Sequence, residues 1–341
     1  MFLSYIYAIL GLSVIIAVHE IGHLISAKKA GMKVERFGIG MGPAIFCIER
    51  GGTKYCLCWV PIGGFCQIKG EEADNNDQDS YNSKPPWHKF MVAFSGPFAN
   101  FVTAFVLLVS LFNIAGQQVG HKIGQLEPDF PAINAGIQVG DRLKGANGSY
   151  TEDTFAIIQQ INENPNQEIL VHIERNGELL DVPVVPKEVE REGKIVGLIG
   201  IVLAPVYQKV SFFQSVKMSF STMGNFFKEF LLFIGRLFTG QLGENVEVKG
   251  PLGIIGIAAQ SASISWISFL FFIAFLSLNL GMLNLFPFPP LDGGKIIFAF
   301  WEGLTKKPIN KKVEIWVNTA GFLILISLIV YVTFKDILGF F

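Results

Sequence analysis

Four stretches of the chain are apolar for long enough to cross a lipid bilayer as helices. They cover residues 2–27, 90–115, 264–288 and 313–333. A helix needs about 20 predominantly apolar residues to span the hydrocarbon core of a membrane. The pattern therefore predicts a polytopic α-helical membrane protein with four transmembrane helices in a lipid bilayer.

A fifth apolar segment, residues 210–238, has a different pattern. Its apolar positions are interrupted by four charged residues, Lys217, Lys228, Glu229 and Arg236. A helix with one apolar face and one charged face lies along the membrane interface more readily than across the bilayer. We therefore expect residues 206–263 to form an amphipathic interfacial helix and a linker.

Residues 116–205 have the pattern of a small α+β domain outside the bilayer. The segments "EILVHIER" and "ELLDVPVVP" alternate apolar and polar residues and are joined by Asn-Gly, which is typical of a β-hairpin. The stretch "PAINAGIQVGDRLKGANG" resembles the core of a PDZ domain, a fold that adds an extended peptide to a sheet edge. This domain could bind a peptide tail, or it could be a spacer without a ligand.

Positive charges predict the orientation of the helices. Nine Lys and Arg residues lie in the loop 28–89, and five Lys residues lie between the third and fourth apolar stretches, whereas the first 27 residues have none. Loops rich in Lys and Arg stay in the cytoplasm. We therefore expect both loops to be cytoplasmic, with both termini and the PDZ-like domain outside.

The overall composition argues against a nucleic-acid partner. Half of the 341 residues are apolar, only 16% are charged, and the formal net charge is −1. The chain therefore lacks the basic character with which proteins attract a phosphate backbone.

All four cysteines fall within twenty residues, at Cys47, Cys56, Cys58 and Cys66. Their spacing lacks the paired C-x2-C pattern of structural zinc sites. We expect them to be small apolar residues in strands, and a metal or redox role stays open.

The first apolar stretch contains a cluster of ionisable groups, His19, Glu20 and His23. Residues i and i+4 share one face of a helix, so the two imidazoles can bind one cation with the glutamate beside them. In this H-E-x-x-H pattern the histidines bind zinc and the glutamate deprotonates a water molecule. Ionisable groups inside a membrane are costly and therefore usually functional, so we predict one zinc ion per chain at this position.

A catalytic zinc site usually has a third protein ligand, and Asp292 is the best candidate. It is the first ionisable residue after the third apolar stretch, and prolines and glycines interrupt the helix around it. In the four-helix topology the first and third helices run in the same direction, so Asp292 and His23 are expected at the same depth. Asp292 could also be the N-cap of the next helix, which would not exclude ligation.

Several motifs together resemble the site-2 protease family of intramembrane zinc metalloproteases, specifically its bacterial RseP/RasP-like branch with a single PDZ domain. They are "HEIGH", "RFGIGMGP", "VPIGGFCQIKGE", "SGPFANF", "GPLGI" and "NLFPFPPLDGG". The resemblance covers nearly the whole chain. It implies a zinc-dependent metalloendopeptidase of the bacterial inner membrane, with its active site near the cytoplasmic side. Its substrates would be transmembrane segments of single-pass membrane proteins, or signal peptides, cleaved in regulated intramembrane proteolysis.

The resemblance also implies roles for individual residues. It assigns zinc to His19, His23 and Asp292, and the general base to Glu20. It assigns substrate binding to Asn284, Gly38, Gly40, Gly63, Gly64 and Phe65, the last five in a membrane-associated β-structure that receives the substrate as an added strand. Asn284 could instead satisfy backbone carbonyls near the prolines. Asn100 is expected to pack between helices with Gly96.

The expected organisation follows from these assignments. It consists of a first transmembrane helix (1–27), a cytoplasmic loop with a β-hairpin (28–89), a second helix (90–115), the PDZ-like domain (116–205), the interfacial helix and linker (206–263), a third helix with its cytoplasmic loop (264–312) and a fourth helix (313–341).

Two alternative functions are open at this point. One is a membrane H-E-x-x-H protease of the type that processes prenylated peptides, which would take its third ligand from Glu302 or Glu314. The other is a membrane scaffold without enzymatic activity, whose PDZ-like domain recruits partners.

Overall fold

The computed structural model describes residues 2–71, 75, 77–151, 153–191, 194–240 and 249–338. The chain divides into two compact units, which we describe separately. The first consists of Met1–Leu111 and Phe212–Phe341, and the second of Phe112–Ser211.

Among the residues that the structure describes, four helices are long and apolar enough to cross a membrane, in agreement with the predicted number. They are α1 (Phe2–Lys29), α2 (Pro86–Ala115), α7 (Trp266–Leu285) and α9 (Lys311–Leu338). Each is rich in apolar residues with few charges, as a lipid-facing helix must be.

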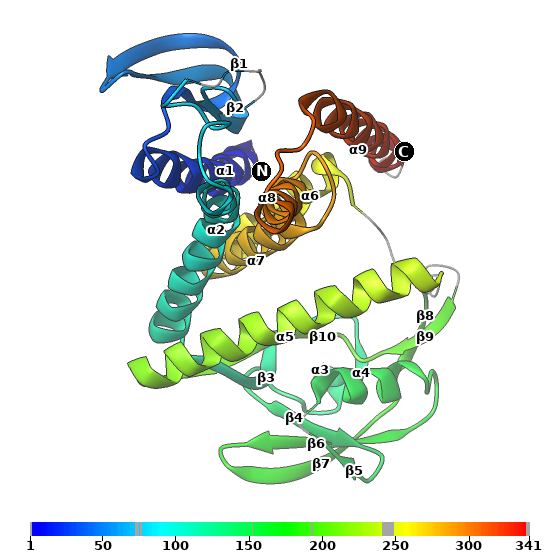
Figure 1. The fold of residues 1–341 in the computed structure, drawn as a ribbon. Coiled ribbons are helices and arrows are strands. Elements are labelled where there is room, and N and C mark those ends of the chain that lie inside the picture. Colours follow the sequence, from blue (N-terminus) through cyan, green and yellow to red (C-terminus); the bar gives the residue numbers. More distant parts are fainter. Residues whose placement is uncertain are drawn as a thin grey trace. The chain divides into compact units, whose positions relative to one another are not determined.

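The described residues of the first unit also form the helices α5 (Phe212–Thr239), α6 (Pro251–Ile264) and α8 (Asp292–Thr305), which are labelled in Figure 1. The sequence predicted α5 as an amphipathic helix but did not predict α6. Helix α6 packs against α1, α7 and α9. The carboxylate of Asp336 in α9 accepts hydrogen bonds from the amides of Gly250 and Gly253, at 3.0 and 2.9 Å, and so satisfies the first turn of α6.

Two long strands, β1 (Val34–Arg50) and β2 (Thr53–Ile68), form an antiparallel layer that packs on α1. Both strands bend, because Arg36–Ile39 pair with Lys54–Leu57 on one side and with Gly64–Gln67 on the other. The last part of β2 is therefore an edge of the layer. No other strand of the described residues pairs with that edge.

The cysteines depart from the expectation that they are only small apolar residues. Cys47 and Cys56 lie opposite each other in the register of β1 and β2 and form a disulfide. Cys58 and Cys66 are free. The pairing depends on the strand register around the turn, which the spacing of cysteines along the chain does not reveal.

The second unit is an α+β structure. Its main sheet has the order β5-β4-β6-β7, and β10-β3 and β8-β9 form two-stranded sheets. The predicted hairpin is present as β6 and β7, and its turn residues Asn176 and Gly177 both have positive φ, as a tight hairpin turn requires. The elements are β3 (Gln117–Leu126), α3 (Pro131–Asn134), β4 (Arg142–Ala146), β5 (Ser149–Tyr150), α4 (Thr154–Asn162), β6 (Ile169–Arg175), β7 (Glu178–Val184), β8 (Lys187–Arg191), β9 (Lys194–Leu198) and β10 (Ile201–Gln208).

Candidate metal centre

Helix α1 presents two buried imidazoles on one face. His19 and His23 are one helical turn apart, and their Nε2 atoms lie 3.2 Å from each other. Only 6% and 9% of these residues is exposed. The helix thus holds two nitrogen ligands side by side in a site that excludes most water.

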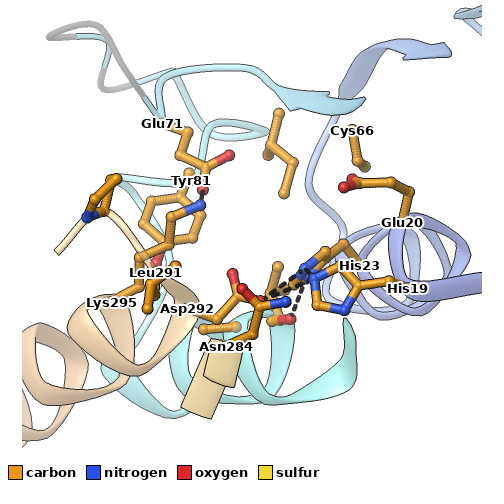
Figure 2. Close-up of a pocket in the computed structure, with 14 residues that line it drawn as sticks. His19, Glu20, His23, Cys66, Glu71, Tyr81, Asn284, Leu291, Asp292 and Lys295 are labelled. Atoms are coloured by element: carbon orange, nitrogen blue, oxygen red, sulfur yellow. Dashed lines mark hydrogen bonds and ion pairs between the residues drawn. The ribbon is translucent and has the colours of Figure 1, made fainter. Parts of the chain in front are cut away.

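Asp292 approaches the same point from another part of the chain. Its Oδ2 atom lies 3.1 Å from His19 Nε2 and 3.2 Å from His23 Nε2, and Figure 2 shows the three side chains converging. Helix α7 ends at Leu285, and Asp292 is the first residue of α8, with Leu291 as the N-cap. The alternative that Asp292 is itself the N-cap is therefore wrong.

The first turn of α8 lies closely against the end of α7. A Cβ atom at Gly293 would overlap the carbonyl oxygens of Leu285 and Phe286. A glycine here lets the two segments approach, and this approach positions the aspartate at the start of α8.

The three side chains fit a divalent cation. His23 Nδ1 lies 2.8 Å from the carbonyl oxygen of Val92, which can only accept, so Nδ1 carries the proton and the neutral ring has a lone pair at Nε2. That lone pair faces Asp292 Oδ2, which is buried and makes no hydrogen bond to the described residues. Two acceptors that face each other are stabilised by a positive charge between them, which a divalent cation or a proton can supply.

The distances between the ligand atoms also suit zinc. Bonds of about 2.0–2.1 Å in tetrahedral geometry separate ligand atoms by roughly 3.3 Å. The observed separations are 3.1–3.2 Å. Two imidazoles and one carboxylate match the ligand set of catalytic zinc sites, which keep a fourth position for water or substrate. Within the described residues, this is the one group of three such side chains close enough to share an ion.

Helix α2 supports the imidazoles with three residues spaced four apart, Val92, Gly96 and Asn100. Val92 supplies the carbonyl that faces His23, and Asn100 Nδ2 lies 3.2 Å from His19 Nδ1. A Cβ atom at Gly96 would overlap His23 Nε2 and would come within 2.9 Å of His19 Cε1. Besides lying on the same face of α2 as Gly96, Asn100 contacts a predicted zinc ligand, which the sequence did not predict.

Sequence reasoning missed the roles of Val92 and Gly96. The spacing i, i+4, i+8 within "VAFSGPFAN" is a signal that these residues share one face of a helix. It could not reveal that this face meets His19 and His23.

Glu20 lies beside the imidazoles and lines a cavity of about 210 Å³ together with His19, His23 and Asp292. Asn284, at the end of α7, lines the same cavity, and so does Cys66. Burial raises the pKa of the Cys66 thiol to about 12. Because the thiolate is the form that binds metal, Cys66 is a poor competitor for the histidines and Asp292.

Lys295 and Glu71 lie on the wall of the cavity away from the imidazoles (Figure 2). Lys295 Nζ lies 2.6 Å from Glu71 Oε1. Lys311 Nζ donates to the backbone oxygen of Glu71, also at 2.6 Å. These contacts tie the segment after β2 to α8 and α9.

The glycines predicted to bind substrate lie in the β-layer, and neither they nor Phe65 line this cavity. Gly40 and Gly63 have positive φ where the strands bend. Gly38 lies under the ring of Phe65, and a Cβ at Gly64 would come within 3.1 Å of Glu20 Cγ. The edge of β2 therefore runs next to Glu20 at Gly64.

The alternative ligands lie elsewhere. Glu302 forms an ion pair with Lys89 at 2.8 Å, and Glu314 forms one with Lys311 at 3.1 Å. Both glutamates line a second cavity that His19 and His23 do not line.

Comparison with known proteins gives a consistent result. The profile of peptidase family M50 matches residues 7–328. A Clostridium perfringens protein that is provisionally named a zinc metalloprotease is 35% identical over 336 residues, covering 98% of each chain. The regulator of sigma-W protease RasP of Bacillus subtilis is 28% identical over 402 aligned positions, covering 94% of each chain.

Among solved structures, a PDZ domain of an SdrC-like protein from Listeria monocytogenes covers 26% of this chain and 90% of its own, at 16% identity. Its TM-score is 0.22.

Proposed function

Because the chain belongs to peptidase family M50, the site-2 protease family, and is a zinc-dependent metalloprotease with several membrane-spanning helices, we propose that it is an intramembrane endopeptidase. Its substrates are transmembrane segments of single-pass membrane proteins, or signal peptides. The observation that carries the proposal is the convergence of His19, His23 and Asp292 next to Glu20 in one cavity.

In this proposal, His19 Nε2, His23 Nε2 and an oxygen of Asp292 hold one zinc ion per chain. Zinc, when bound, supplies the Lewis acidity that polarises a peptide carbonyl and lowers the pKa of a water molecule. Glu20 accepts a proton from that water as its oxygen bonds to the carbonyl carbon. Glu20 then passes the proton to the amide nitrogen as the peptide C–N bond breaks.

Asn284 helps to hold the substrate or to stabilise the transition state. Its side chain lines the cavity with Asp292, and an amide in this position can hydrogen-bond to a backbone group of the substrate or to the developing oxyanion.

The edge of β2 receives the substrate as an added strand. A transmembrane helix hides its peptide bonds in internal hydrogen bonds, so cleavage requires unwinding, and unwound backbone in lipid costs several kcal/mol per unsatisfied group. Cys66 and Ile68 of this edge line the cavity. The backbone N–H and C=O groups of the edge can therefore form hydrogen bonds with an unwound substrate peptide beside Glu20.

The chain lies in the bacterial inner membrane, with both termini outside and the metal centre near the cytoplasmic side. Lys28 and Lys29 end α1 one to two turns after His23, which supports this orientation. The exposed side chains of Phe46 and Trp59 in the β-layer support contact of that layer with the membrane. The second unit is a PDZ-like domain outside, which binds a peptide tail or serves as a spacer.

Two observations disfavour the alternatives. Glu302 and Glu314 are engaged with lysines in a different cavity, which weakens the prenyl-peptide type of protease. A scaffold without activity is excluded because the chain is a zinc metalloprotease by family.

The test compares the purified wild-type chain with Glu20→Gln in liposomes that contain a single-pass reporter helix. We expect cleavage to fall about 10²- to 10⁴-fold, the usual contribution of a general base, while zinc content is unchanged. Equal cleavage by both proteins would refute the proposed mechanism.

A further inference from the structure

We propose that Asn100 is a positioning residue for the metal centre. Its side-chain oxygen accepts a hydrogen bond from Nδ1–H of His19, and this bond keeps the Nε2 lone pair of His19 directed at zinc. The inference rests on the zinc site proposed above and adds a residue that does not touch the metal.

The burial of Asn100 is the first observation. Asn100 is fully buried in α2, at 0% exposure, and its side chain has one hydrogen-bonding partner among the described residues, His19 Nδ1 at 3.2 Å. Burying an amide costs about 1–3 kcal/mol unless it is hydrogen-bonded. An apolar residue would fill this space between helices without that cost, so packing alone does not account for an asparagine here.

The second observation is the unequal support of the two imidazoles. The carbonyl oxygen of Val92 can only accept, so it fixes the proton of His23 on Nδ1. His19 also has to carry its proton on Nδ1 if its Nε2 is to bind zinc. Asn100 is the group that faces His19 Nδ1.

The orientation of the Asn100 amide then follows from the chemistry. A half-turn of the amide exchanges its oxygen and nitrogen without changing the space that it fills. With the nitrogen toward His19, Nδ1 must accept, and the proton moves to Nε2. With the oxygen toward His19, Nδ1 donates and Nε2 is free to bind a metal. Only the second arrangement is compatible with zinc, so the proposal assigns Oδ1 to the contact.

A purely structural role for Asn100 makes a different prediction. Its backbone oxygen accepts a 2.9 Å hydrogen bond from Ser277 Oγ of α7, which joins the two helices. Ser277 is also fully buried. Ser277→Ala therefore perturbs the same helix contact without changing any group that faces His19, and it serves as the matched control.

The experiment measures the zinc dissociation constant of the purified full-length chain by competition with a chelator. Asn100→Leu should raise the dissociation constant about 10- to 100-fold, the usual cost of losing a partner of a metal-binding histidine. Asn100→Asp keeps the shape of the side chain and can still accept a hydrogen bond from Nδ1–H. It should therefore bind zinc at least tenfold more tightly than Asn100→Leu. Ser277→Ala should match the wild type.

Wild-type affinity in Asn100→Leu would overturn the proposal. So would Asn100→Asp binding as weakly as Asn100→Leu, or an equal loss in Ser277→Ala. If Asn100→Leu does not fold, as judged by circular dichroism, Asn100→Asp decides alone: retained affinity supports the proposal and a loss of tenfold or more overturns it. His19→Ala separates this result from the zinc site itself, because unchanged zinc binding in that variant would refute the proposed function instead.

Discussion

Asp141 and Asp292 are both buried aspartates, but the protein surrounds them differently. Asp141, in the second unit, is 1% exposed and accepts hydrogen bonds from Arg175 at 2.7 and 2.8 Å and from the amide of Gln138 at 2.7 Å. Asp292, in the first unit, is 7% exposed, and its Oδ2 faces two imidazole nitrogens without a hydrogen bond.

The difference shows that one buried carboxylate can serve stability while another can serve function. The charge of Asp141 is balanced by Arg175, so it can serve the stability of its own unit. The imidazoles that face Asp292 would be acceptors in the proposed metal-binding form, and a cation would then balance the charge of the carboxylate. A buried carboxylate without a hydrogen-bond donor is therefore a candidate for a functional role. A buried carboxylate whose hydrogen bonds are all made is a candidate for a structural role.

The largest expected effect comes from removing the aspartate at the metal centre. Asp292→Ala should weaken zinc binding by more than about 100-fold, because loss of a direct ligand exceeds the 10- to 100-fold cost of losing an outer partner. Glu302→Ala is the control and should retain zinc. Chelator competition measures both, and the reverse order would favour the prenyl-peptide type of protease.

A smaller loss is expected when α2 is kept from approaching the imidazoles. Gly96→Ala places a methyl group where His23 Nε2 lies, so the ring or the helix must shift. We expect zinc affinity to fall about 10- to 100-fold, comparable to disturbing a supporting contact. Gly224→Ala, where a Cβ meets nothing within 4 Å, is the matched control. Unchanged affinity in Gly96→Ala would show that the site tolerates a wider spacing of α1 and α2.

Asp141→Asn should instead affect stability and leave zinc binding unchanged. Breaking a buried ion pair costs 3–5 kcal/mol, but the Arg175 side chain keeps 26% of its surface exposed, so we expect a loss of about 2 kcal/mol. Hydrogen exchange of the β4 and β6 amides in the full-length protein measures this loss. A change in zinc affinity would contradict the separation of the two carboxylates.

The same carboxylate predicts a dependence of stability on pH. Burial alone would raise the pKa of Asp141, but the hydrogen bonds from Arg175 and from the Gln138 amide outweigh it, so the pKa is below its ordinary value. Its contribution is therefore complete above the unfolded-state pKa of about 3.9 and is lost as the pH falls toward the lower folded-state value.

Exchange protection of β6, corrected for intrinsic rates, should thus stay constant down to about pH 4 and decline as the pH falls further. The decline should be smaller in Asp141→Asn. The same decline in both proteins would assign the acid sensitivity to other groups.

The smallest expected effect concerns Asp336, a carboxylate that caps a helix. Asp336→Asn keeps an acceptor near the amides of Gly250 and Gly253 but removes the charge at the start of α6. We expect a loss of about 0.3–1 kcal/mol, measured by thermal unfolding in detergent, with zinc content unchanged. A larger loss would mean that the contact organises more than the first turn of α6.

Features that depend on local spacing could be predicted from the sequence. Helix length and composition identify α1, α2, α7 and α9, and the i, i+4 spacing puts His19 and His23 on one face. Asp292 could be proposed because it is the first ionisable residue after the third apolar stretch.

Features that depend on tertiary contacts could not be predicted in this way. Nothing along the chain says which face of α2 meets α1, so the contact of Asn100 with His19 was not foreseen. The disulfide between Cys47 and Cys56 requires the register of β1 and β2, which bend around glycines. Helix α6 is short and apolar, and no charge pattern distinguishes it from a linker.

The central claim is that one zinc ion joins two helices through His19, His23 and Asp292. Diffraction from zinc-loaded crystals of Glu20→Gln, recorded above and below the zinc absorption edge, tests it most directly. The account predicts one anomalous peak per chain, bonded to both Nε2 atoms and to a carboxylate oxygen of Asp292 at about 2.0–2.2 Å. A peak beside Glu302 or Glu314, or a zinc ion that Asp292 does not touch, would contradict it.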